Sequence, residues 1–135
     1  MKTFNDKIKE LETLIEHSYE SGVSLEEAER LAGRFLHAAL QVSTELKNLD
    51  LDARMKRTSV KAIKAAVYLA EVQKNEKKPS DVLLNALVDT SDLVAGEQRR
   101  ADASEADRDE LERVYNVVTA AHHHFKQIAK GNFNG

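Results

Sequence analysis

Apolar residues recur every three or four positions along most of the chain, which is the spacing of one face of an α-helix. One proline and five glycines in 135 residues leave few positions that would break a helix. The fold class is therefore predicted to be all-α, an antiparallel bundle of four to five helices that forms a single domain over residues 1–135. The predicted helices cover residues 5–22, 25–47, 51–75 and 82–94, and a last helix ends at Gly131.

Several helix ends carry local cap signals. Asn5 is a favourable N-cap for the first helix, and Gly22 stands where a left-handed C-cap is expected. The run from Ser24 to Glu27 is a capping box, with a hydroxyl at the N-cap and a carboxylate three residues later. Pro79 cannot continue a helix, and Ser80 after it is suited to cap the next one. Residues 131–135 are expected to be a frayed tail.

Two connections are less marked. Residues 48–52 are predicted to form a short connection, in which Asp50 or Asp52 caps the following helix. Residues 96–110 contain no large apolar residue, and a break is predicted near 100–104, because a helix that is polar all round has nothing to bury. The alternative is a polar extension that joins the two flanking helices into one.

Charge alternates in sign along the chain, although the net charge is only -3. Residues 1–50 carry a net charge of -4, residues 51–78 of +5, residues 79–112 of -7 and residues 113–135 of +3. Antiparallel helices of opposite charge attract each other along their edges, so this alternation favours particular helix pairs. The same alternation also sets the basic segment apart as a candidate binding surface.

The basic segment separates into two faces when it is placed on a helix at about 100° per residue. Between Ala53 and Ala70 it holds five cations and no acid. One side forms a basic row that consists of Arg54, Arg57, Lys61, Lys64 and Tyr68. The other side is mostly apolar and consists of Met55, Ser59, Ala62, Ile63, Ala66, Leu69 and Ala70.

The basic row is the candidate nucleic-acid-binding site. Arg54 to Lys64 spans about 15 Å at 1.5 Å per residue, which is enough to contact several phosphates along one strand. Tyr68 offers a ring on which a base can stack. The alternative is a solvated helix face that pairs with acids within residues 97–112.

Other chemistries find little support in the composition. The chain has no cysteine, which excludes disulfides and zinc–thiolate sites. It has no catalytic motif, so it is predicted not to be an enzyme and to need no cofactor. His122, His123 and His124 point about 100° apart on a helix, so they do not form a metal site by themselves. No apolar run reaches the ~18 residues of a membrane helix, and the N-terminus lacks an apolar signal core, so a cytoplasmic location is expected.

Two regions carry a family resemblance. Residues 50–66, which include Asp50-Leu-Asp-Ala-Arg-Met-Lys-Arg57, and residues 107–113 resemble small all-helical accessory proteins of double-stranded-DNA bacteriophages. In size and helical content the chain is similar to phage recombination mediators, which load a recombinase onto single-stranded DNA. The resemblance implies a helical, non-catalytic accessory protein, located in the host cytoplasm, and it assigns no role to individual residues.

These observations together predict a non-catalytic accessory protein that binds an anionic partner. The predicted partner is DNA or RNA, contacted along its backbone by the basic row. The alternative is a protein–protein adaptor or an assembly component of an oligomeric complex, in which the charge alternation directs subunit pairing. A homo-oligomer that does not bind membranes is expected in both cases.

Overall fold

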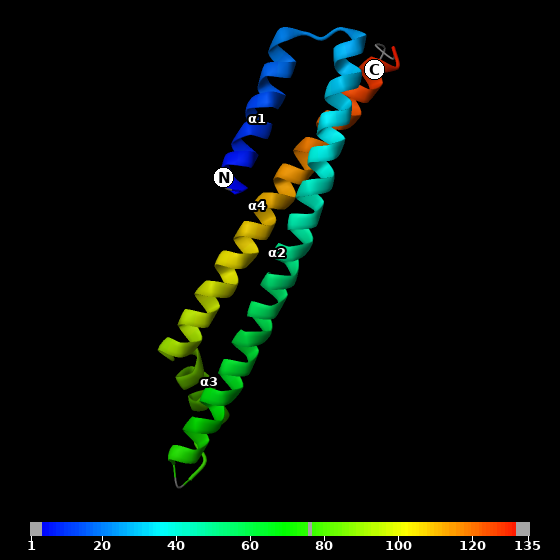
Figure 1. Ribbon diagram of the computed structural model, residues 1–135. Helices are drawn as coiled ribbons and strands as arrows, with labels where there is room; N and C mark the ends of the chain where they lie inside the picture. The colour runs from blue at the N-terminus through cyan, green and yellow to red at the C-terminus, as the bar shows by residue number, and fades with distance from the viewer. Residues whose placement is uncertain (1–3, 76, 132–135) are drawn as a thin grey trace. The chain divides into compact units, whose positions relative to one another are not determined.

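The computed structural model describes residues 4–75 and 77–131, which fold almost entirely into helices (Figure 1). Within these ranges, four helices follow one another: α1 (Phe4–Ser21), α2 (Leu25–Lys74), α3 (Asp81–Asp89) and α4 (Asp92–Ala129). No strand occurs within these two described ranges. The predicted all-α helical bundle is therefore confirmed, with four helices.

Contacts between helices group the chain into two compact units. The first unit comprises Met1–Leu46 and Glu110–Gly135, and the second comprises Lys47–Asp109. Helices α2 and α4 therefore each contribute one part to each unit. The single domain over residues 1–135 stays a prediction.

In the first unit, the core is built around two stacked phenylalanine rings. The ring centroids of Phe35 in α2 and Phe125 in α4 lie 5.7 Å apart, and the ring planes differ by 7°. Both side chains are fully buried. The two phenylalanines and the other buried residues of α2 and α4 recur every three or four positions. This spacing places them on one face of each helix, which packs against a neighbouring helix. These other buried residues include Ala28, Leu31, Ala32, Leu111, Val114, Val118 and Ala121.

Helix α1 covers the first unit only partly. None of its described side chains is fully buried, and the apolar ones are half-buried: Ile8, Leu11, Leu14 and Ile15. An open cavity of about 770 Å³ lies along α1 and α2, and its lining includes His17 and Arg34. An ion pair joins α1 to α4, between Glu12 Oε1 and Arg113 Nη2 at 3.1 Å. Within this unit, α1 thus contributes less apolar burial than α2 and α4 do.

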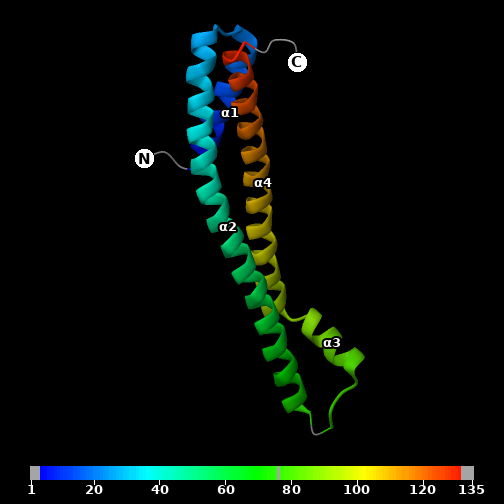
Figure 2. The ribbon, with the colours of Figure 1, turned by 90° about the vertical axis from the view of Figure 1, so that its right-hand side faces the viewer.

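In the second unit, α2 and α4 run antiparallel, and α3 lies between them in the chain (Figure 2). Ser59 Oγ of α2 donates a hydrogen bond to Glu97 Oε2 of α4 at 3.1 Å, whereas the earlier residue Asp52 accepts one from the later residue Ser104. A later residue of α2 therefore bonds to an earlier residue of α4, as expected for antiparallel helices. The buried residues of this unit are Ala53, Val60, Leu84, Val88, Val94, Ala101 and Ser104.

Helix α2 continues without interruption through residues 48–52, so the connection predicted there is wrong. This segment contains neither glycine nor proline. Neither of its two aspartates caps a helix. Asp50 Oδ2 pairs with Arg54 at 3.0 Å and Asp52 Oδ2 pairs with Lys56 at 3.0 Å, both one turn later on α2, and both aspartates also bond to α4. Carboxylates that are satisfied in this way no longer favour a turn over a helix.

Helix α4 also continues where a break was predicted, near residues 100–104, and that prediction is wrong as well. The chain turns earlier, at Thr90 and Ser91, after α3 has ended. The segment gains stability because it buries two small residues, Ala101 at 0% and Ser104 at 4% exposure. A helix with no large apolar residue is therefore stabilised by close approach and by the polar contacts described below.

Serine caps are found where they were predicted. Ser24 Oγ accepts a hydrogen bond from the backbone N–H of Glu27 at 3.2 Å. Ser80 Oγ accepts one from the backbone N–H of Leu83 at 3.2 Å, directly after Pro79. Each bond satisfies one of the donors that a helix N-terminus leaves unpaired, so both starts are determined locally.

Glycine ends are confirmed too. Gly22 follows α1 with a φ of 66°, and Gly131 follows α4 with a φ of 77°. Only glycine adopts this left-handed conformation without a steric cost. The side chain of Asn5 and the tail of residues 132–135 lie outside the described part of the chain. Within the described part, no helix combines the length and the apolar character that crossing a membrane requires.

Candidate binding surface on helix α2

All five residues of the basic row lie on α2 in the second unit. Lys61 and Lys64 are exposed, and neither has a hydrogen bond or ion pair with any residue of the described ranges. The side chain of Arg54 is 75% exposed and pairs with Asp50 on its own helix. Tyr68 is half-buried. The remaining residue of the row, Arg57, is bound to side chains of α4. The row is therefore incomplete as a free basic surface.

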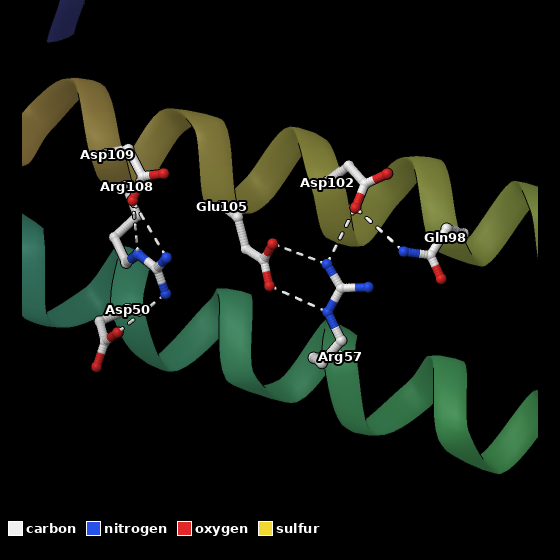
Figure 3. Close-up of polar contacts among 7 residues, drawn as sticks. All are labelled: Asp50, Arg57, Gln98, Asp102, Glu105, Arg108 and Asp109. Atoms are coloured by element: carbon white, nitrogen blue, oxygen red, sulfur yellow. Dashed lines mark hydrogen bonds and ion pairs between the residues drawn. The ribbon is translucent and has the colours of Figure 1, made fainter.

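Arg57 is held by two carboxylates of α4 (Figure 3). Its Nε donates to Glu105 Oε1 at 3.0 Å, and its Nη2 donates to Glu105 Oε2 at 2.8 Å and to Asp102 Oδ1 at 3.0 Å. This fork uses the planar geometry of the guanidinium, which a lysine does not have. The alternative interpretation, in which the basic segment pairs with acids within residues 97–112, is confirmed for Arg57.

The pKa values of Arg57 and Asp102 are shifted by the same contacts. The pKa of Arg57 is raised, chiefly by its bond to Glu105 and then by its bond to Asp102. The pKa of Asp102 is lowered, mainly because Arg57 donates to it and secondarily because Gln98 does. Each group thus stabilises the charged form of the other, so the contact is ionic at neutral pH.

Further polar contacts join the two helices on either side of Arg57. Arg108 Nη1 of α4 lies 3.5 Å from Asp50 Oδ1 of α2, and Arg108 Nη2 lies 3.1 Å from Asp109 on its own helix (Figure 3). The hydroxyl of Ser104 donates to Asp52, which lowers the pKa of that carboxyl, and Lys56 lowers it further. These partners were not identified individually from the sequence. Their only signal was the opposite net charge of the two segments.

Replacing Arg57 with glutamine is expected to lower the melting temperature by a few degrees at neutral pH. The same change at Lys61 is expected to leave it unaltered, since Lys61 has no partner in the described residues. Arg57 holds the pKa of Asp102 below its ordinary value of 3.8. The stabilisation is therefore present above that value and is lost as pH falls through the lowered pKa.

Melting curves recorded by circular dichroism from about pH 7 down to about pH 2 measure this effect. The difference between wild type and Arg57→Gln should shrink at the acidic end. An equal loss in Lys61→Gln, or a difference that does not change with pH, would contradict the assigned contact.

Most of the apolar side of the basic segment does not pack in the second unit. Met55 is 63% exposed and Leu69 58% exposed, whereas Ala53 and Val60 are buried. On a helix, these buried positions point about 130° away from the middle of the apolar side. The basic row therefore lies between a packed face and an exposed apolar face of the same helix. This arrangement was not expected from the sequence.

The three consecutive histidines point in different directions in the first unit. His122 Nδ1 lies 2.8 Å from the carbonyl oxygen of Ala32, so this nitrogen carries the proton and donates. The ring of His124 contacts Phe125 edge-on, with centroids 5.1 Å apart. Across the described ranges, no group of three or more His, Cys, Asp or Glu side chains has the arrangement of a metal site. His122 thus makes a hydrogen bond to α2, and His124 makes a ring contact with Phe125.

Helix α2 of the second unit therefore presents a basic row beside an exposed apolar face, with the acids of α4 beyond Arg57. Such a surface offers electrostatic attraction and apolar contact to a partner. In comparisons with known proteins, no protein-family model, no curated protein and no solved structure matches this chain.

Proposed function

We propose that this protein is a non-catalytic accessory protein that binds an anionic partner through the basic face of α2. The observation that supports this most directly is the pair Lys61 and Lys64, which are exposed and have no partner in the described residues. No acid occurs on α2 from Ala53 to Ala70 to neutralise them. An incoming anion would therefore meet their full charge.

A nucleic-acid backbone is the first candidate partner. Arg54, Lys61 and Lys64 would contact successive phosphates, and Tyr68 would assist by stacking on a base. Arg57 is already bound to two carboxylates, so the proposed footprint has three cations instead of four. The resemblance to phage recombination mediators makes single-stranded DNA the first nucleic acid to test.

A protein–protein adaptor, or a component of an oligomeric complex, is the second candidate. One observation favours it: Leu51, Met55 and Leu69 are each more than half exposed on the neighbouring face of the helix. A phosphate backbone gains nothing from such side chains, whereas a protein partner buries them. In both cases, the partner would be anionic and would contact the same basic row.

Charge reversal of both lysines, in the variant Lys61→Glu, Lys64→Glu, is expected to weaken binding by at least about tenfold. The probes are labelled single-stranded DNA, duplex DNA, RNA and polyglutamate, measured by fluorescence anisotropy over a salt series. Wild-type binding should weaken regularly as salt rises. On single strands, the loss of two phosphate contacts should reduce the slope of log K against log salt by about 1.4.

The matched control is Lys77→Glu, Arg99→Glu, which makes the same charge change at two exposed positions of the second unit. This variant should bind as the wild type does. The proposal fails if wild-type protein binds none of the four probes at low salt, or if the control loses as much affinity as the test variant.

A further inference from the structure

The exposed apolar face of α2 has the spacing of a helix–helix seam. We name as the outer stripe the residues Leu51, Met55, Thr58, Ala62, Ala65 and Leu69, all of which are exposed. Their intervals alternate between four and three residues, which is the heptad spacing with which one helix packs along another. The hydroxyl of Thr58 donates to the carbonyl of Arg54 at 3.0 Å, so it is already satisfied within the helix. The outer stripe thus has the pattern of a seam, although no helix covers it among the described residues of the second unit.

The opposite side of the same turns is already occupied. Ala53 and Val60 are 1% and 3% exposed in the second unit, and in the heptad of the outer stripe both hold the position that points directly away from the seam. Helix α2 therefore packs within its own unit on one side and presents a second seam on the other. A helix that needed only its internal packing would carry polar residues there.

The edges of the outer stripe indicate the charge of its partner. In the heptad, one pair of edge positions is filled by Arg54 and Lys61, and the equivalent positions on the other edge by Ser59 and Ala66. Asp52, on that second edge, is paired with Lys56 at 3.0 Å. Edge residues form the interhelical ion pairs that select a partner. Arg54 pairs with Asp50 on its own helix and Lys61 has no partner in the described residues, so this edge favours acids opposite it.

A second copy of the same stripe does not provide those acids. An antiparallel pair would place Arg54 and Lys61 of one copy beside the same cations of the other. A parallel pair would place them beside Ser59 and Ala66, which carry no charge. Neither orientation gives the two cations a carboxylate, and like charges across a seam reduce affinity.

We propose that the outer stripe docks an amphipathic helix of another protein, with acidic residues along the edge that faces Arg54 and Lys61. This inference rests on the proposed function, because it identifies the anionic partner as a protein helix. Ala62 and Ala65 are small, so the docked helix carries large apolar side chains opposite them, which fill the space that the alanines leave. Met55 and Leu69 are the principal apolar contacts for the docked helix, because they are large side chains near either end of the stripe and are 63% and 58% exposed.

Two matched synthetic peptides of about three heptads test the proposal. Both carry leucine at the seam positions and a covalent link on the far face that holds them helical. One has glutamate at the edge positions and the other has lysine. By anisotropy at low salt, the glutamate peptide is expected to bind wild-type protein about tenfold tighter than the lysine peptide. The variant Arg54→Glu, Lys61→Glu should reverse this preference, because its edge is now acidic.

The apolar part of the contact is tested by Met55→Gln, Leu69→Gln, which should weaken the glutamate peptide by about tenfold. The control is Val82→Gln, Leu83→Gln, which changes two exposed apolar residues of α3 in the same unit and should bind normally. Melting curves of all variants confirm that each is folded. Equal affinity for both peptides, or a preference that charge reversal leaves unchanged, would overturn the proposal.

Parallel titration with single-stranded and duplex DNA separates this inference from the proposed function. One possible result is that DNA binds and the glutamate peptide does not. If DNA binding is also lost when Lys61 and Lys64 are reversed, and is unchanged in Met55→Gln, Leu69→Gln, the anionic partner is a nucleic acid. The proposed function then stands and the docked helix is rejected. If neither the peptides nor any anionic probe binds at low salt, both are rejected.

Discussion

Replacing Asn48 with proline is expected to lower the free energy of unfolding by about 3 kcal/mol. Asn48 is exposed in the interior of α2, so the effect comes from the backbone and not from a lost side-chain contact. Proline has no N–H for the carbonyl four residues earlier, at Thr44, and its ring collides with that carbonyl. Urea denaturation followed by circular dichroism measures the change.

Asn48→Ala is the control, and it should leave stability unchanged or slightly raised, because alanine has the higher helix propensity. If Asn48→Pro costs less than about 0.5 kcal/mol, residues 48–52 form a connection after all. A second substitution, Ala103→Pro, makes the same test in α4, where residue 103 is exposed within the stretch that the sequence pattern favoured as a break.

Truncating Phe125 to alanine is expected to cost about 3–5 kcal/mol. Its ring is 1% exposed and stacks on the fully buried ring of Phe35, so its removal leaves a cavity between α2 and α4 in the first unit. The cost combines the lost transfer of apolar surface with the loss of dispersion contacts around that cavity. The same denaturation experiment measures it.

Leu40→Ala is the matched control, because Leu40 is an apolar residue of the same unit that is 62% exposed. It should change stability by less than about 0.5 kcal/mol. The double variant Phe35→Ala, Phe125→Ala should cost less than the sum of the single changes, since both remove the same contact. A loss in Leu40→Ala as large as that in Phe125→Ala would mean that the opposite face of α2 is buried.

Helical content and several helix ends were determined by the sequence alone. Gly22 and Gly131 take left-handed conformations that other residues avoid, and Ser24 and Ser80 cap the N-termini that follow them. These effects involve residues within four positions of one another, so a local pattern contains all the information needed.

Helix continuity was decided by tertiary contacts. Asp50 and Asp52 resemble caps in sequence, but Arg54 and Lys56 pair with them one turn later, and Arg108 and Ser104, more than fifty residues later, bond to the same carboxylates. The polar stretch of α4 resembles a loop until Ala101 and Ser104 are seen to be buried. Contacts between residues so distant in the chain leave no periodic signal in either segment.

The candidate site followed the same division. The sequence alone located the acid-free basic segment and its two faces, because both depend only on residue identity and helical spacing. Which face of α2 is packed, and which cation of the row is bound by α4, depended on the neighbouring helix. Arg57 is bound by Glu105 and Asp102, whereas Lys61 has no such partner in the described residues, although both belong to one row. Only the antiparallel pairing of α2 with α4 distinguishes a cation that stabilises the fold from one that remains available to a partner.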